Sequence, residues 1–310
     1  RKMSSSTKNS ESSSSTSTTN NGKKKKVRVK KKVSQKEKFK NFEIAPTWEQ
    51  LIEGLSEEQT QMIEEFTTWL NDPSTPTSQF VKKDKILACK FIRGTKFRIE
   101  KAKTKYLAYV ELKNEWGDCS LEVVAPFLAT GAQMLPPWAV DNEGRQILFV
   151  TAENLNPKLD VNAMRAKAAD YMFNLFLQYP QFQEQGNVLV LDLKNASMMM
   201  SNRQAQNEMN RLIQATPCRL GSGSIMHPPW FFSILFKIVS SILPAKIIGR
   251  IKVRSESELH EIIPKENLLP RLGGDLQFDH RAWLKRRFEI EKKTIPAWLA
   301  NDLPPPEPTE

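Results

Sequence analysis

NVLVLDL, at residues 187–193, is the most informative segment for the architecture of this protein. Both alternating sets of positions are apolar until Asp192, so neither face of this stretch is polar. A strand that is apolar on both faces is typical of the centre of a parallel sheet, because helices cover such a sheet on both sides. The stretch therefore predicts a central strand in an α/β domain.

Strands and helices alternate around this stretch. QILFV at 146–150 predicts a second strand, and residues 223–226 predict a short third one. Apolar residues at helical spacing predict helices over 162–178 and 202–215. This order predicts parallel pairing through right-handed crossovers.

The preceding part of the chain, residues 47–116, has helical periodicity only. Ser56, followed by Glu58 and Gln59, predicts a helix start, and another helix is expected to begin near Asp84. A small all-α domain is therefore expected before the α/β domain.

The formal net charge of +11 is concentrated in the first 40 residues, which hold 14 Lys or Arg and two Glu. Eight of the ten residues in KKKKVRVKKK, at 23–32, are basic. The run predicts a membrane tether, a nuclear localisation signal or a solvated disordered tail. Because the remaining chain is close to neutral, no nucleic-acid partner is expected.

The sequence does not favour a disulfide-rich protein, a metalloprotein, an enzyme or a membrane-spanning protein. Cys89, Cys119 and Cys218 form no CxxC pair, so neither a disulfide framework nor a metal site is expected, and a reducing cytoplasmic setting fits. GxSxG, P-loop, GxGxxG and HExxH motifs are absent, and the three histidines show no catalytic spacing. We expect no enzyme and no cofactor. No signal-like or membrane-spanning apolar segment is found, so any membrane association is expected to be peripheral.

WFFSILFKIVSSIL, at 230–243, is too apolar for an ordinary surface helix, because its polar residues form only one narrow stripe. At 14 residues it is also too short to span a bilayer. It predicts either a buried central helix or a lid that covers an internal lipid and meets a membrane interface.

A second amphipathic piece follows. Lys246 and Arg250 lie four residues apart, which places them on one face of a helix, and Lys252 and Arg254 lie just beyond. Such groups suit anionic phospholipid headgroups, although the solvated face of an ordinary helix has the same pattern.

Five short pieces of sequence, taken in order, resemble the CRAL-TRIO lipid-binding family, which includes retinaldehyde-, tocopherol- and phosphatidylinositol-transfer proteins. The pieces are Asp84…Leu87…Phe91-Ile92-Arg93…Lys96-Phe97…Lys101-Ala102, Asp141…Gly144-Arg145, Val190-Leu191-Asp192-Leu193-Lys194, Pro217…Arg219 with Ile225…Pro228, and Leu269-Pro270-Arg271-Leu272-Gly273-Gly274. Together they span nearly 200 residues, from about Asp84 to Asp279.

The resemblance implies a mostly parallel sheet with helices, an apolar cavity and a mobile lid helix, preceded by a small all-α domain. The expected divisions are a disordered basic tail at 1–45, a helical domain at 46–130, a CRAL-TRIO domain at 131–280, and a C-terminal helix with a Pro-rich tail at 281–310. The implied function is binding of one lipid and its exchange at membrane surfaces by a monomer.

Three groups of residues are expected to carry this function. The cavity residues are Phe149, Phe173, Leu189, Leu191, Val239, Ile242 and Leu243. The membrane face of the lid is expected to hold Phe231, Phe232, Leu235 and Ile238. Arg219, Lys246 and Arg250 are expected to contact anionic headgroups, and plain core packing is the alternative role of Phe149, Phe173, Leu189 and Leu191.

The chain departs from the inositol-binding members at two places. Cys218 stands where they carry Glu in a Pro-Glu-Arg segment, and residues 239–242 replace their Lys-Pro-Phe-Leu. These departures favour another phospholipid, a sterol-like molecule or an isoprenoid as the bound lipid. A lipid-sensing adaptor and a phosphatidylinositol or phosphoinositide transfer protein are the alternative functions.

Overall fold

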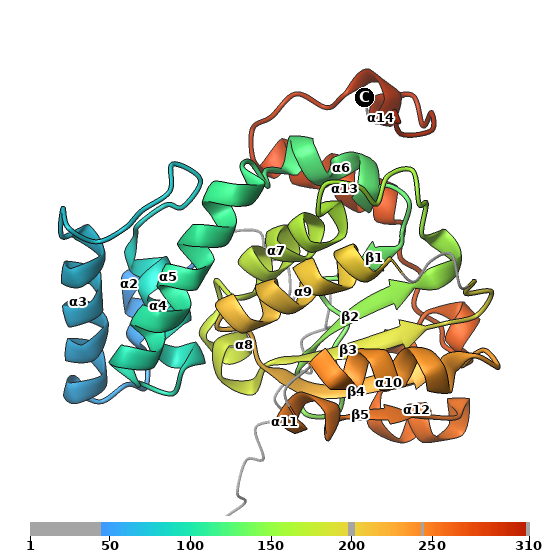
Figure 1. The fold of residues 1–310 in the computed structure, drawn as a ribbon, viewed down its shortest axis with the longest axis horizontal. Coiled ribbons are helices and arrows are strands. Elements are labelled where there is room, and N and C mark those ends of the chain that lie inside the picture. Colours follow the sequence, from blue (N-terminus) through green and yellow to red (C-terminus); the bar gives the residue numbers. More distant parts are fainter. Residues whose placement is uncertain (1–44, 198–201, 243–244, 308–310) are drawn as a thin grey trace, which may run out of the picture. The chain divides into compact units, whose positions relative to one another are not determined.

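The computed structural model describes residues 45–197, 202–242 and 245–307 (Figure 1). All of these belong to one compact unit, Gln35–Glu310, whereas a second unit, Arg1–Ser34, lies outside the described residues. The basic run at 23–32 therefore also lies outside them, and its role stays a prediction.

A five-stranded sheet forms the centre of the described chain. Its strands, in spatial as well as sequence order, are β1 (Gln133–Met134), β2 (Gln146–Thr151), β3 (Asn187–Asp192), β4 (Leu220–Met226) and β5 (Ile251–Val253). The pairs from β2 to β5 are parallel, and β1 adds an antiparallel edge. The predicted mostly parallel sheet, with residues 187–193 contributing its central strand, is confirmed.

Two strands have no counterpart in the sequence analysis, because β1 and β5 are two and three residues long and show no periodicity. The strand β5 also corrects one expectation. Helix α11 (Ala245–Ile248) ends before Gly249, and Arg250 lies in the turn that leads into β5. Lys246 and Arg250 therefore do not share a helical face.

The helices before the sheet are α2 (Trp48–Ile52), α3 (Glu57–Asn71), α4 (Lys85–Gly94) and α5 (Ile99–Trp116). Ser56 forms a capping box with Gln59, and the carboxylate of Asp84 accepts the Leu87 backbone N–H at 2.8 Å. Such caps satisfy N–H groups that have no partner within the helix. Both predicted helix starts are confirmed.

The remaining helices follow the chain through and beyond the sheet. They are α6 (Leu121–Leu128), α7 (Met164–Phe176), α8 (Pro180–Gln185), α9 (Arg203–Ala215), α10 (Phe232–Ile242), α12 (Glu256–Ile262), α13 (His280–Ile290) and α14 (Ala297–Ala300). The predicted helices over 162–178 and 202–215 are present as α7 and α9, which lie side by side (Figure 1).

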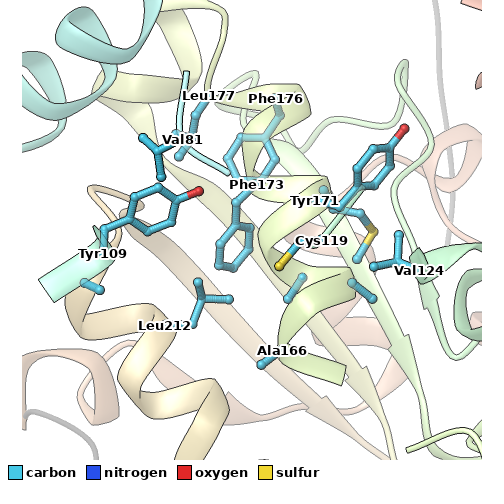
Figure 2. Close-up of a cluster of buried hydrophobic side chains, with 14 of the residues drawn as sticks. Val81, Tyr109, Cys119, Val124, Ala166, Tyr171, Phe173, Phe176, Leu177 and Leu212 are labelled. Atoms are coloured by element: carbon cyan, nitrogen blue, oxygen red, sulfur yellow. The ribbon is translucent and has the colours of Figure 1, made fainter. Parts of the chain in front are cut away.

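The sheet divides the apolar core into two layers. Ile147, Phe149, Val188 and Val190 pack on one face with Leu259 of α12. The alternate residues of β2 and β3 point toward α7 and α9, because successive side chains of a strand point to opposite faces. On this second side, one cluster joins residues of α5, α7 and α9 (Figure 2).

Buried charge fixes α5 against α7. Lys113 of α5 forms an ion pair with Asp170 of α7 at 2.9 Å, and both side chains are almost fully buried. The Tyr109 hydroxyl donates to the same carboxylate at 3.0 Å and accepts from the Asn174 amide at 3.0 Å. A buried charge requires such partners, so the network stabilises the observed docking of these helices.

Replacing Asp170 with Ala should lower the free energy of unfolding by about 3–5 kcal/mol, because the Lys113 ammonium would stay buried without its counter-ion. Urea unfolding measures the change. Glu100→Ala is the control, since the Glu100 pair with Lys103 is largely exposed and is worth at most about 1 kcal/mol. Equal losses in the two variants would contradict the structural role of the buried pair.

Candidate functional site

An apolar cavity of 230 Å³ lies between the sheet and helices α7 and α9. Leu148 and Val150 of β2 face it beside their partners in β3, Leu189 and Leu191. Its other walls come from α7, α9, α11 and the adjoining strands. The lining residues are Gln133, Leu148, Val150, Arg165, Ala169, Phe173, Asn187, Leu189, Leu191, Met209, Ile213, Cys218, Leu220, Ile247 and Ile251.

The central strand itself shows that this side of the sheet is hollow. Val188 and Val190 are fully buried in the solid layer, whereas Leu189 and Leu191 are only half-buried although they lie in the middle strand. A small residue contributes to this space, because Ala169 lines the cavity from α7 with only a methyl group.

A second cavity of 150 Å³ continues the first toward the carboxyl ends of β2 and β3. Gln133, Val150, Arg165 and Leu191 line both cavities. Ligands in open α/β sheets commonly bind beyond the carboxyl ends of the strands. The two cavities share part of their walls, and that shared part includes the polar side chains of Gln133 and Arg165.

A basic groove of 410 Å³ adjoins the apolar cavity at its other side. Ile213, Cys218, Leu220 and Ile247 line both spaces. Among the described residues that line the groove, no Asp or Glu occurs, and seven are basic. These are Lys96, Arg98, Lys101, Lys105, Arg219, Lys246 and Arg250.

Crowding of positive charge affects Lys105. Partial burial of its ammonium group, together with repulsion from Lys101, lowers the pKa of Lys105 to about 8. Its Nζ donates to the carbonyl oxygens of Gln214 and Thr216, the latter at 2.7 Å. An anion in the groove would favour the charged form, so the electrostatics of the groove suit a negatively charged group.

Arg219, an expected headgroup residue, has a structural role in addition to its place in the groove. Its guanidinium donates to the carbonyl oxygens of Gly94 at 2.9 Å and Glu184 at 2.7 Å, and also to that of Arg93. Burial lowers the pKa of Arg219 from its ordinary value. The residue therefore ties the end of α4 to α8, and these bonds occupy donors that a phosphate would need.

The structure brings Phe173, Leu189 and Leu191 together in the cavity wall. Phe149 does not line the cavity. Phe149 pairs with Val190 and packs in the solid layer. Its side chain points to the face of the sheet opposite that of its neighbours Leu148 and Val150. The involvement of the other three residues in lipid binding stays a prediction.

The segment expected to form a lid is largely helical in α10 (Phe232–Ile242). Phe231, expected on the membrane face, is buried, and Phe232 is half-buried. Trp230 and Ile234 are the exposed apolar residues here, with 86% and 54% of their surface accessible, and the expected set omitted them. The side chains of Leu235, Ile238, Val239 and Ile242 are not described, and Leu243 lies outside the described residues.

Four basic side chains of the groove were not expected from the sequence. They come from α5 and the turn before it: Lys96, Arg98, Lys101 and Lys105. Lys96 and Lys101 were considered only as part of a motif that resembles the CRAL-TRIO family. The alternating basic residues between 96 and 105 are the signal that was available. Their distance along the chain from Lys246 and Arg250 concealed the shared site.

The three histidines have structural partners. His227 Nδ1 contacts Asp192 at 2.8 Å, and Arg271 Nε pairs with the same carboxylate at 2.6 Å. The rings of His260 and His280 lie 3.1 and 2.9 Å from backbone carbonyl oxygens. Asp192 therefore joins the end of β3, the residue before the Pro228-Pro229 pair and the turn at 269–274.

Concave, mostly apolar spaces with a few polar groups are typical of small-molecule binding sites, and the cavity in this α/β domain has that character. Residues 129–274 match the CRAL/TRIO domain. These residues therefore form a domain of the CRAL-TRIO lipid-binding family.

Individual proteins that resemble this chain have low sequence identity to it. Clavesin-2 of Mus musculus is 22% identical over 232 residues, which cover 70% of this chain and 70% of that protein. Tyrosine-protein phosphatase non-receptor type 9 of Homo sapiens is 26% identical over 202 residues, 64% of this chain but only 34% of the phosphatase. The crystal structure of Sfh5 aligns with 78% of this chain, and the alignment covers 92% of the Sfh5 chain, at 10% sequence identity and a TM-score of 0.45.

In residues 45–197, 202–242 and 245–307, no cluster of His, Cys, Asp and Glu has the arrangement of a metal site. Within the same ranges, no helix has the length and apolar character needed to cross a bilayer.

Replacing Arg219 with Met should lower the free energy of unfolding by about 2–3 kcal/mol, because carbonyl oxygens near the ends of α4 and α8 would lose a charged donor. Thermal and urea unfolding measure this loss. The exposed groove residue Lys246 gives the control, since Lys246→Met should change stability by no more than about 0.5 kcal/mol. An unchanged stability in Arg219→Met would leave Arg219 with only its expected headgroup role.

Proposed function

We propose that this protein holds one lipid in the apolar cavity and exchanges it with a membrane whose anionic headgroups are held in the basic groove. The adjacency of the two spaces is the observation that carries the proposal. Ile213, Cys218, Leu220 and Ile247 line both, so a lipid leaving the cavity on this side meets the groove directly.

The energetics favour exchange over permanent retention. Burying each CH₂ group of a lipid in a dry cavity contributes about 0.8 kcal/mol relative to water. The interior of a bilayer supplies nearly the same gain, so transfer between cavity and membrane is close to balanced. The barrier to opening the protein, rather than the overall affinity, then sets the rate.

The groove provides the electrostatic part of membrane binding. Each basic side chain near an anionic membrane surface contributes roughly 1 kcal/mol. Lys96, Arg98 and Lys101 add cations that the expected set of Arg219, Lys246 and Arg250 did not contain. Phosphoinositides therefore stay among the anionic lipids that suit the groove, although the chain lacks the glutamate of inositol-binding relatives at position 218.

The segment around α10 provides the apolar part. Trp230, two residues before α10, and Ile234, within it, expose large apolar side chains on a mainly apolar segment. Tryptophan suits the boundary between water and lipid, because its ring is apolar and its N–H can stay hydrated. We assign α10 the role of the lid that opens upon membrane contact. The proposed cycle involves no chemical reaction and no phosphatase activity.

Filling the cavity should abolish lipid binding. The variant Leu189→Trp places a large ring in the centre of the cavity wall, whereas Leu189→Met conserves volume and is the matched control. After incubation with vesicles of mixed cellular lipids, we expect the wild type and Leu189→Met to retain lipid at about one molecule per chain, and Leu189→Trp to retain less than a tenth of that amount. Mass spectrometry of the extracted lipid gives both quantity and identity. A fully loaded and folded Leu189→Trp protein would exclude this cavity.

Removing the exposed apolar residues should slow transfer without emptying the cavity. For Trp230→Ser combined with Ile234→Ser, we expect transfer between phosphatidylserine-containing vesicles to fall about tenfold, because apolar insertion is lost. Leu303→Ser is the control, since Leu303 is 53% exposed but distant in sequence from α10. Equal transfer rates in the double variant and the wild type would remove the lid segment from the membrane-binding surface.

A further inference from the structure

A proline-rich segment follows α14 on the surface of the protein. Residues 303–307 read Leu-Pro-Pro-Pro-Glu and form neither helix nor strand. Each proline ring holds φ at about −65°, and each residue before a proline avoids the α-helical region. Because Leu303, Pro304 and Pro305 all precede a proline, the segment favours the polyproline II conformation. We call residues 303–307 the proline strap.

The exposure of the proline strap follows the three-residue period of polyproline II, in which residues three apart share a face. Leu303 and Pro306 belong to one face and are both exposed. Pro304 and Glu307 belong to the next face and are also exposed, whereas Pro305, on the third face, is half-buried. The protein therefore covers part of one face and leaves two adjacent faces open.

Contacts at its two ends hold the proline strap on the protein surface. Arg281 Nη2 donates to the Leu303 carbonyl oxygen at 2.7 Å, and Lys158 Nζ pairs with Glu307 at 2.7 Å. Within the described part of the chain, residues 304–306 take part in no backbone hydrogen bond. The middle of the strap therefore presents proline rings and backbone acceptors together.

This combination suits a particular kind of protein partner. Polyproline II segments are bound by small domains with aromatic-lined grooves, which include SH3, WW and EVH1 domains. The aromatic rings pack on exposed proline rings, and Leu303, with 53% of its surface accessible, adds a large apolar side chain beside them. Because the strap is rigid before it binds, docking orders little additional chain.

The charge of the proline strap narrows the choice of partner. Glu307 is exposed, and no Lys or Arg occurs in residues 303–310. The pair between Glu307 and Lys158 is exposed on both sides, so water screens it and a partner's cation can replace Lys158. Complementary charge then requires Lys or Arg beside the aromatic groove of the partner.

We infer that the proline strap is a docking segment for a protein domain whose aromatic, proline-binding groove is flanked by basic residues. The groove receives the two open faces of the strap, and its basic flank pairs with Glu307. Docking brings the protein to a specific protein partner. This role does not depend on a lipid in the cavity.

Three purified domains serve as probes: an EVH1 and a WW domain whose aromatic grooves are flanked by Lys or Arg, and an SH3 domain whose groove is flanked by Asp and Glu. Each is labelled with a fluorophore and titrated with the full chain, and anisotropy reports binding. We expect the EVH1 domain, the WW domain or both to bind. The SH3 domain should bind at least about tenfold more weakly, because its acidic flank repels Glu307.

Two pairs of substitutions locate the binding on the chain. Pro304→Ala combined with Pro306→Ala should weaken binding about tenfold, because apolar contact and the preset backbone are both lost. Pro73→Ala combined with Pro76→Ala is the matched control, since both prolines are exposed in the loop after α3. The control variant should bind with the wild-type affinity.

The charge contribution is tested separately with Glu307→Lys, which keeps the prolines. We expect this variant to bind about fivefold more weakly than the wild type at low salt, and the difference to shrink at high salt. Equal affinities at low salt would overturn the pairing of Glu307 with a basic flank.

Failure of both the EVH1 and the WW domain to bind the wild type would overturn the docking role. An unchanged affinity in the folded Pro304→Ala and Pro306→Ala variant would overturn it as well, because binding would then involve another surface. Circular dichroism checks the folding of each variant. Neither result affects the proposed lipid binding, which the lipid content of the wild type measures independently.

Discussion

The two faces of β3 pack differently, and this difference separates the stable core from the cavity. Val188 and Val190 lie in a solid layer with residues of α12, whereas Leu189 and Leu191 face a space that α7 and α9 do not fill. Strand geometry forces this division, because successive side chains point to opposite faces. One face thus supplies stability, and the other is free to hold a guest.

The helices above that hollow face need support that a solid core would otherwise provide. Buried polar bonds supply part of it. The Lys113–Asp170 pair fixes α7 against α5, and Arg219 holds the ends of α4 and α8. Both contacts are directional, so they set the position of a helix even where apolar packing is incomplete. A stable cavity follows from this polar framework around it.

The site joins three physical environments within one small region. The apolar cavity lowers the free energy of a lipid body, the basic groove attracts anionic headgroups, and the exposed side chains of Trp230 and Ile234 suit an interface. A guest crossing between protein and bilayer needs all three in succession.

The sequence alone determined the α/β class, the central strand, the helix starts at Ser56 and Asp84, and the family, because periodicity, caps and ordered motifs are local properties. Three features became clear only from the three-dimensional structure. Phe149 lies on the face of the sheet opposite the cavity, and Phe231 is buried while Trp230 is exposed. Arg250 lies outside α11. The tertiary structure also brought residues 96–105 to residues 246–250. The face of the sheet to which a side chain points, its degree of burial and the proximity of distant segments all depend on contacts between elements. A local sequence pattern does not contain this information.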